Sequence, residues 1–286
     1  MRLPLDGGVV LALGGGGMRG VAHLGVLAEL EEGGVRIKGI AGTSSGAMLG
    51  ALWLLAGSAG AVARVRQFTS SGVAKRMPDI GGEVSSAGLA GLFQRARHGV
   101  ALLRMLTAGH AMSVERFLDQ VGFFLPDLTI EAMPRPYLVV ATDNGTGDEV
   151  RLDRGPLRLA VAASSAMPGL VAPIAWNGRR LQDGGAVGEI PVAAARTLGT
   201  PVVAVEVSEG LPRANPDHDG LPRAMFRAAA MGWQELRRRM LSEADAVIAP
   251  HVNHLHWADY HAVDESVAAG RAAAREFLEG QLRAGG

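Results

Sequence analysis

The chain has 286 residues, 48% of them hydrophobic, and carries 28 Lys+Arg against 28 Asp+Glu. This length suits one large α/β domain or two small ones, and the composition is typical of a packed globular protein. The balanced charge gives no electrostatic reason to expect a nucleic-acid partner. The sequence has no cysteine, which excludes disulfides, thiolate metal sites and a cysteine nucleophile.

Two stretches of the sequence indicate where in the cell the protein is expected. Residues 1–8 lack a signal-peptide pattern, because the apolar run from Val9 soon ends in glycines, so we expect a cytoplasmic protein. Residues 39–63 carry no charge. They are long enough for a bilayer, which takes about 20 apolar residues. Because glycine-containing turns interrupt them, we favour a buried strand, turn and helix over a membrane span.

The first predicted elements form a βαβ unit. The apolar run 9–13 predicts a buried parallel strand that ends at four consecutive glycines. Residues 19–32 show helical spacing, and 35–41 predict a second strand. The crossover between the two strands is expected to be right-handed.

Ser44 follows the second strand in a G-x-S-x-G sequence, between Gly42 and Gly46, and a helix is predicted at 47–55. Such a turn holds a serine in a strained backbone conformation, and the helix N-terminus directs amide groups at it. This arrangement serves a nucleophile. The motif is common by chance in a chain with 40 glycines, so it needs partners.

The glycine loop is the first candidate partner. Residues 15–20 match G-x-G-x-x-G after a strand, which is the context of a dinucleotide site. That use expects an acidic residue at the end of the second strand, where Ser44 and its neighbours stand instead. Consecutive glycine amides also form an anion-binding concavity. Ser44 follows the strand next to the one that leads into the glycine loop, so the loop and the serine should lie side by side at one edge of the sheet. We therefore favour an oxyanion hole over a dinucleotide site.

Asp183 is the second candidate. It precedes two glycines, after a hairpin predicted by Asn177 and Gly178. An isolated Asp-Gly-Gly is more often a simple turn. A free aspartate, with a pKa of about 3.9, is a poor base near neutrality. Burial beside an apolar pocket raises that pKa, and Asp183 then becomes a candidate base for Ser44.

The rest of the chain continues the alternation of strands and helices, without repeats, and predicts one domain over 1–286. Strands are predicted at 137–142, 149–152, 201–207 and 246–250, and helices at 113–125, 157–165, 191–198, 222–242 and 264–282. In the helix 222–242, we expect Phe226, Ala229, Ala230, Trp233 and Leu236 to face the core.

The segment 70–112 is loosely patterned and contains several glycines. No acidic residue lies between positions 84 and 114, where Arg95, Arg97 and Arg104 lie among apolar residues. One interpretation is a surface helical excursion with solvated arginines. The other is a lid that contacts an anionic lipid surface through 84–114.

Histidines gather near the carboxyl terminus, at His251, His254, His256 and His261. One of them could complete a Ser–Asp–His order of the α/β-hydrolase type. Alternatively, they could bind a metal, although their spacing fits no zinc signature well. We expect neither a metal nor an organic cofactor.

Taken together, the glycine run 14–20, the turn 42–46 and the Asp-Gly-Gly that starts at Asp183 resemble the bacterial patatin-like phospholipases. The segments 141–143 and 162–169 agree, and the resemblance covers roughly residues 8–210. It implies a three-layer α/β/α fold with a central, mostly parallel sheet and a Ser–Asp dyad without histidine. The implied roles are Ser44 as nucleophile, Asp183 as base, Gly15, Gly16 and Gly17 as oxyanion amides, and Arg19 as the residue that fixes the loop.

The implied activity is hydrolysis of ester bonds in phospholipids, lysophospholipids or related lipids through an acyl-enzyme on Ser44. The resemblance implies a lipid substrate, no cofactor and no nucleic-acid partner. It is compatible with a cytoplasmic protein that binds transiently at a membrane surface. Two alternatives stay open: a triad α/β-hydrolase that uses a C-terminal histidine, and a non-catalytic lipid- or nucleotide-binding protein.

Overall fold

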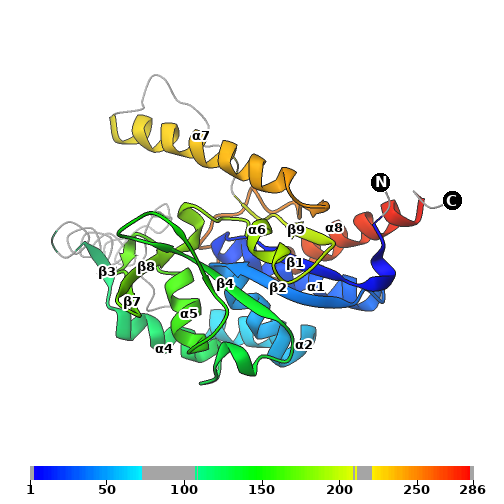
Figure 1. Cartoon of the computed structure of the whole chain (residues 1–286), viewed down its shortest axis with the longest axis horizontal. Helices are drawn as coiled ribbons and strands as arrows, with labels where there is room; N and C mark the ends of the chain where they lie inside the picture. Colours follow the sequence, from blue (N-terminus) through cyan, green and yellow to red (C-terminus); the bar gives the residue numbers. More distant parts are fainter. Residues whose placement is uncertain (1–2, 73–106, 108, 209, 211–220, 284–286) are drawn as a thin grey trace, which may run out of the picture.

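The computed structural model describes residues 3–72, 107, 109–208, 210 and 221–283. A sheet of eight strands lies between two layers of helices (Figure 1). The strands are β1 Val9–Leu13, β2 Ile37–Thr43, β4 Tyr137–Asp143, β5 Glu149–Leu152, β7 Ile174–Trp176, β8 Arg179–Asp183, β9 Val202–Val205 and β10 Ala246–Ile248. Two short strands, β3 His110–Met112 and β6 Gly169–Val171, form a separate parallel pair.

The helices alternate with these strands along the chain. They are α1 Ala22–Glu32, α2 Ser45–Ser70, α4 Val114–Phe124, α5 Leu157–Ser164, α6 Val192–Arg196, α7 Leu221–Ser242 and α8 Val263–Arg283. Short 3₁₀ turns occur at η1 Leu5–Gly7, η2 Gly17–Val21, η4 Ile130–Ala132 and η5 Gly184–Ala186.

The first strand of the chain is in the middle of the parallel part of the sheet. The strand order is β10-β9-β1-β2-β4-β8-β7, and β5 also pairs with β4. Strands β10, β9, β1, β2 and β4 are parallel, whereas β5, β7 and β8 add an antiparallel part. The predicted three-layer α/β/α fold with a mostly parallel sheet is confirmed.

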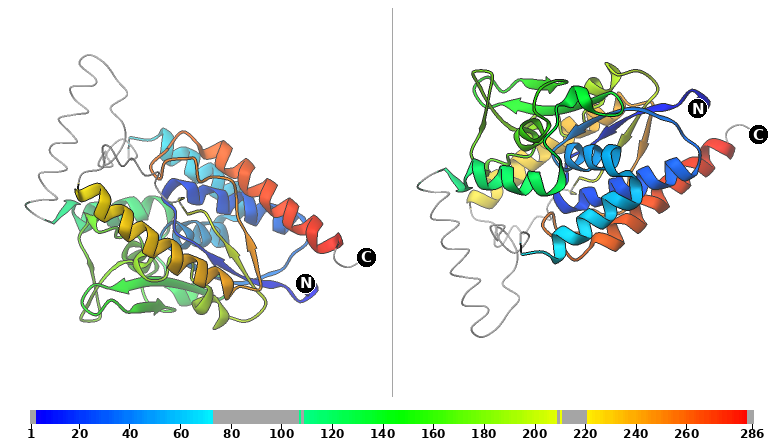
Figure 2. Two further views of the ribbon diagram at one scale, coloured as in Figure 1. Left: turned by 90° about the horizontal axis from the view of Figure 1, so that it is seen from above. Right: turned by 90° about the horizontal axis from the view of Figure 1, so that it is seen from below.

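Strand β1 shows why both faces of the sheet are covered. Its alternate residues Val9, Leu11 and Leu13 belong to the larger core cluster, with α1, α2, α4, α5 and α8. Val10 and Ala12 belong to a smaller cluster, with α6. The two views in Figure 2 show α1, α2 and α8 together on one side of the sheet and α7 on the other. A strand between two such layers is apolar at every position.

Helix α2 includes the helix predicted at 47–55 and continues to Ser70, with a break at Gly57, where φ is 67° and ψ is 175°. By length and composition α2 is apolar enough to cross a membrane. Its first two turns pack on the sheet, with Ala47, Ala51 and Leu52 buried. The predicted strand, turn and buried helix therefore agree with this part of the structure.

Two predictions fare differently. The prediction for helix 222–242 is wrong for Ala229, Trp233 and Leu236, which are exposed, while the side chain of Phe226 lies outside the described residues. Among the described residues, α7 packs on the smaller core cluster through Met240 and Leu241, near its carboxyl end. Most of the segment 70–112, and most of 84–114, lies outside the described residues. The lid therefore stays a prediction, as does the single domain over 1–286.

Candidate active site

Ser44 occupies a strained turn between β2 and α2. Its φ of 53° and ψ of −119° lie in a region that residues other than glycine rarely adopt. Both flanking glycines are required by space. A Cβ on Gly46 would collide with the carbonyl of Leu13, and one on Gly42 would lie 2.6 Å from the backbone of Ala47. The G-x-S-x-G pattern therefore follows from close backbone approach on both sides of Ser44.

The hydroxyl of Ser44 donates a hydrogen bond to Asp183. The distance from Oγ to Oδ2 is 2.8 Å, although the two residues are 139 positions apart. The sheet brings them together, because β4 pairs with β2 on one side and with β8 on the other. The second carboxylate oxygen of Asp183 accepts the N–H of Gly185 at 2.7 Å, and the hydroxyl of Thr142 donates to the Asp183 carbonyl at 3.0 Å. The carboxylate is thus held in one orientation.

Burial raises the pKa of Asp183 from 3.8 to about 6, and the nearby charge of Glu189 adds to this effect. The hydrogen bonds from Gly185 and Ser44 act in the opposite direction. The side chain is only 8% exposed. Asp183 therefore remains ionised at neutral pH and is a stronger base than a free aspartate.

The glycine loop lies directly beside the serine. A Cβ built on Gly15 would be 3.4 Å from the Cβ of Ser44. The N–H of Gly15 donates to the Glu189 carbonyl at 3.0 Å. In the described part of the chain, no backbone acceptor is found for the N–H groups of Gly16 and Gly17. Of the three predicted oxyanion amides, these two are available to an incoming group.

Two buried side chains hold the loop in place. Arg19 donates from Nε to the Val207 carbonyl at 3.2 Å and from Nη1 to the Leu255 carbonyl at 3.3 Å. The Nε2 atom of His23 lies 2.8 Å from the carbonyl oxygen of Gly14. Burial lowers the pKa of His23 to about 4, so the ring is neutral and Nε2 donates. Arg19 therefore fixes the loop to two distant segments.

Ser164 supports the strained turn from below. The N–H of Ser44 donates to the Ser164 hydroxyl at 2.8 Å, and that hydroxyl donates to the Val140 carbonyl. The sequence assigned no role to Ser164. Its only signal is the pair of serines in the segment 162–169.

An apolar hollow of about 170 Å³ opens beside Ser44 and Asp183. Its walls come mainly from the glycine loop, α2, α4 and the loop before α8, and include Met18, Met48, Leu49, Val65, Phe68, Phe117, Val121, Phe124, Leu170, Trp257 and Tyr260. The rings of Phe68 and Phe124 are 4.7 Å apart. This hollow has the shape and chemistry to receive a hydrocarbon chain.

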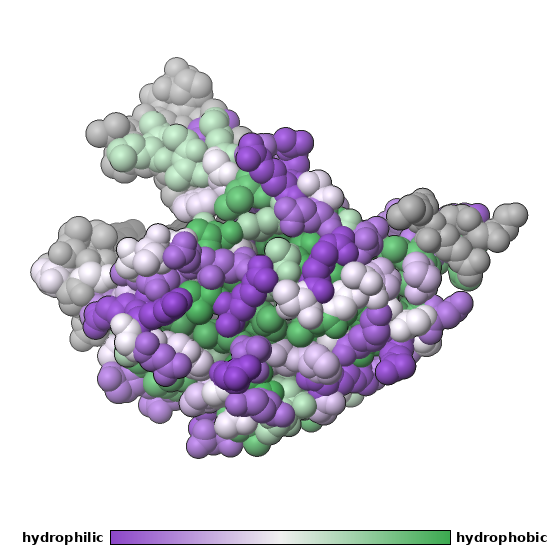
Figure 3. Space-filling model, in the orientation of Figure 1, coloured by the Kyte–Doolittle hydropathy of each residue, from purple (hydrophilic) through white to green (hydrophobic). Residues whose placement is uncertain are grey.

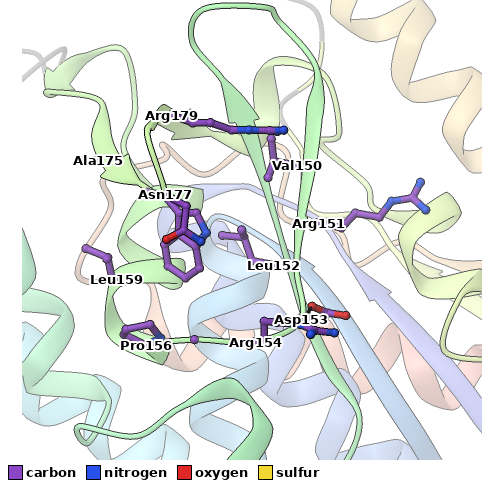
Figure 4. Close-up of a pocket in the computed structure, with 12 residues that line it drawn as sticks. Val150, Arg151, Leu152, Asp153, Arg154, Pro156, Leu159, Ala175, Asn177 and Arg179 are labelled. Atoms are coloured by element: carbon purple, nitrogen blue, oxygen red, sulfur yellow. Dashed lines mark hydrogen bonds and ion pairs between the residues drawn. The ribbon is translucent and has the colours of Figure 1, made fainter.

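A larger hollow of about 610 Å³ lies at β5 and the β7–β8 hairpin, away from the pair (Figure 4). Arg151, Arg154 and Arg179 line it. Each of these arginines faces a carboxylate, at 2.7, 3.1 and 3.8 Å respectively. Because Ser44 and Asp183 do not line this hollow, it takes no direct part in their chemistry.

The four carboxyl-terminal histidines are exposed. His254 pairs with Glu265 at 2.8 Å, and the rings of His251 and His254 lie 5.6 Å apart. Within residues 3–72, 107, 109–208, 210 and 221–283, no group of three or more His, Asp or Glu side chains is placed to hold a metal ion. The described geometry thus joins Ser44 to Asp183 and leaves these histidines on the surface.

Comparison with known families decides the relationship. Residues 11–196, more than half of the chain, match the model of the family described as patatin-like phospholipase. The chain belongs to the patatin-like phospholipase family. The resemblance stated from its motifs is confirmed.

Relatives of this patatin-like chain are considerably longer. It is 35% identical over 218 residues to an uncharacterized NTE family protein of Mycobacterium tuberculosis, covering 75% of this chain and 52% of the relative. It is 30% identical over 249 residues to patatin-like phospholipase domain-containing protein 6 of Mus musculus, covering 85% of this chain and 16% of that protein. The chain therefore spans about half the length of the mycobacterial relative and a smaller part of the mouse one.

A solved structure shows the same fold. VipD from Legionella pneumophila matches this patatin-like chain with a TM-score of 0.53 over 98% of the chain and 68% of VipD. The sequences are 16% identical, so the similarity concerns the fold alone.

Proposed function

We propose that this patatin-like protein is a serine acyl hydrolase of lipid esters, in which Ser44 is the nucleophile and Asp183 the base. The observation that carries the proposal is the 2.8 Å hydrogen bond from Ser44 Oγ to a buried carboxylate. The apolar hollow beside this pair supports a substrate with an acyl chain.

In the proposed reaction, Ser44 Oγ attacks the ester carbonyl carbon while its proton passes to Asp183. The N–H groups of Gly16 and Gly17 donate to the oxyanion of the tetrahedral intermediate. Collapse of this intermediate breaks the ester bond, and Asp183 returns the proton to the departing alcohol. Water, deprotonated by Asp183, then attacks the acyl-enzyme and releases the fatty acid and the serine.

The family and the hollow favour phospholipids, lysophospholipids or related lipids as substrates. An acyl chain in the hollow lies against Phe68 and Phe124, and its carbonyl reaches Ser44 at the edge of the same hollow. This placement leaves the head group outside, where the hollow opens. Binding energy from the chain would then position the ester for attack.

The test is activity on a soluble short-chain chromogenic ester. Ser44→Ala and Asp183→Asn should each lower kcat/KM on the order of 10³-fold or more, because the two groups act as a unit. His254→Gln serves as the matched control and should retain wild-type activity. Full activity of Asp183→Asn would refute the dyad. Loss of activity on replacing a carboxyl-terminal histidine, with folding intact, would favour a triad.

Labelling by a fluorophosphonate probe is a second measurement. The probe should modify wild-type protein on Ser44 and leave Ser44→Ala unmodified, because it reacts with activated serines. Absence of labelling in folded wild-type protein would favour a binding protein that has kept the fold.

A further inference from the structure

Helix α7 presents large apolar side chains to solvent. Four of the seven exposed large hydrophobic residues in the described part of the chain lie on it: Met225 at 65%, Met231 at 48%, Trp233 at 42% and Leu236 at 36%. Figure 3 shows apolar residues along the amino-terminal part of the helix and polar ones toward its carboxyl end. Such a concentration on one element marks an interaction surface.

Three of these exposed residues, Met225, Trp233 and Leu236, belong to a regular helical stripe, whereas Met231 lies on another side of the helix. Met225, Ala229, Trp233, Leu236 and Met240 follow one another at spacings of three or four residues, so they lie along one side of the helix. At the carboxyl end this stripe reaches the body of the protein, where Met240 packs against the smaller core cluster. Toward the amino-terminal end the same stripe becomes exposed.

The carboxyl half of α7 is firmly attached to the fold. Leu241 also packs on the smaller core cluster, which contains residues of α6. Arg237 pairs with Glu189 at 3.1 Å and with Glu206 at 3.7 Å. The helix is therefore a fixed arm, and its amino-terminal half extends beyond the layer formed by α6 (Figure 1).

The charge of α7 differs from that of the whole chain. Residues 221–242 include five arginines and one glutamate, a net charge of +4, in a chain whose net charge is 0. Arg238 and Arg239 both pair with Glu235, each at 2.9 Å, so one carboxylate is shared between two guanidinium groups. A helix with a Trp- and Met-containing apolar side and excess arginine is the type that lies at an anionic lipid–water interface.

We propose that α7 is an interfacial helix that docks this protein on an anionic lipid surface. Met225, Trp233 and Leu236 enter the headgroup region, while the positive charge of the α7 arginines other than Arg237, which pairs with Glu189 and Glu206, attracts the anionic lipid. The amino-terminal end of α7 lies toward the end of the molecule at which β1 and β2 end, and these strands carry the glycine loop and Ser44 (Figure 1). Docking therefore brings the lipid surface to the same end of the protein as the candidate site.

Vesicle co-sedimentation tests the docking directly. Wild-type protein should sediment with vesicles of phosphatidylcholine and phosphatidylglycerol, less with phosphatidylcholine alone, and less as salt is raised. The double variant M225E/W233E should bind the anionic vesicles about tenfold more weakly or worse. Leu282→Glu, which alters an exposed apolar residue of α8, is the matched control and should bind like wild type.

Several outcomes would overturn the proposal: no sedimentation of wild-type protein with anionic vesicles, equal binding by M225E/W233E, or equal weakening by Leu282→Glu. Sedimentation velocity, which measures the oligomeric state, tests the alternative that the stripe binds a second copy of the chain. If wild-type protein ignores vesicles but is a dimer that M225E/W233E converts to monomer, the stripe is an interface between two copies of the chain. Circular dichroism checks that the variants are folded.

An activity measurement, which rests on the proposed function, distinguishes the two proposals. M225E/W233E should match wild type on a soluble short-chain ester and lose activity on phospholipid in anionic vesicles. Equal activity of the variant and wild type on vesicles would contradict docking through α7. If wild-type protein hydrolyses neither substrate, the proposed function fails, and vesicle binding still decides the docking by itself.

Discussion

Asp183, the proposed base for Ser44, also destabilises the folded state when it is ionised. Burial raises its pKa from 3.8 to about 6, so the native protein favours the protonated carboxyl more than the unfolded chain does. The stability contributed by the protonated group is present below the unfolded pKa and is lost as pH rises through the native pKa. At neutral pH the ionised form costs about 3 kcal/mol.

We therefore predict that Asp183→Asn stabilises the protein while it abolishes activity. The free energy of unfolding should increase by up to about 3 kcal/mol near pH 8, where the variant removes a buried charge. Near pH 4 it should change little, because the protonated carboxyl of the folded protein is as uncharged as the amide. Urea unfolding of wild type and variant at both pH values measures this. An equal gain at the two pH values would show that ionisation of Asp183 is not its source.

The roles proposed for Ser44 and Asp183 could be anticipated because each residue lies in a short motif of distinctive residue types. Other contacts could not. The amide of Gly15 is engaged by the carbonyl of Glu189, and the backbone of Ser44 is supported by Ser164. These bonds join backbone or common side chains across long sequence separations, for which a local pattern carries no signal.

At the scale of elements, prediction succeeded where burial controls the residue type. Strand β1, whose five apolar residues are all buried, has the predicted bounds. The partly exposed β5 also has the predicted bounds, and the turn at Asn177 and Gly178 connects β7 to β8. Strands β3 and β6, of three residues each, are too short to show a period. For α7 the helical period placed Ala229, Trp233 and Leu236 on one side, but these residues are exposed and do not face the core. The period could not reveal where the body beneath the helix ends.

Helix α7 also affects the pKa of Asp183 through the ion pair of Arg237 with Glu189, and this gives a second prediction. The negative charge of Glu189 helps raise the pKa of Asp183, and Arg237 pairs with Glu189 at 3.1 Å. For wild type, kcat/KM on a soluble ester should rise with pH through about 6. Glu189→Gln should move this limb to lower pH and Arg237→Gln to higher pH.

The matched control is Arg238→Gln, a substitution on the same helix at a side chain that, among the described residues, pairs with Glu235 alone. Its pH profile should coincide with that of wild type. If Glu189→Gln and Arg237→Gln moved the limb in the same direction, the charge of Glu189 would not be acting on Asp183.

At the scale of the whole molecule, the fold depends on a helix beyond the region that matches the family model. Helix α8 crosses α1 at two glycines: a Cβ on Gly25 would collide with the Val267 carbonyl, and one on Gly270 with the Ala22 carbonyl. Arg271 and Arg275 of α8 both pair with Glu29 of α1. Because α1 follows the glycine loop, α8 supports the candidate site from the outside.

Gly270→Val should therefore destabilise the protein by about 3 kcal/mol or more, because neither backbone can withdraw without moving a helix. Thermal unfolding should show a lower Tm, and activity on a soluble ester should fall with it. Gly280→Val, at a position of α8 with open space around it, should stay close to wild type. Similar losses in both variants would point to helix propensity and not to the crossing.

The crossing of α1 and α8 has a consequence for synthesis. Ser44 and Gly270 are 226 positions apart, so at translation rates of about 5–20 residues per second the ribosome needs on the order of 10–45 s to supply the second after the first. During that interval the nascent chain has its serine but lacks first Asp183 and then the helix that braces α1. A nascent chain shorter than 183 residues therefore cannot form the Ser44–Asp183 hydrogen bond, and one shorter than 270 residues lacks the α1–α8 crossing.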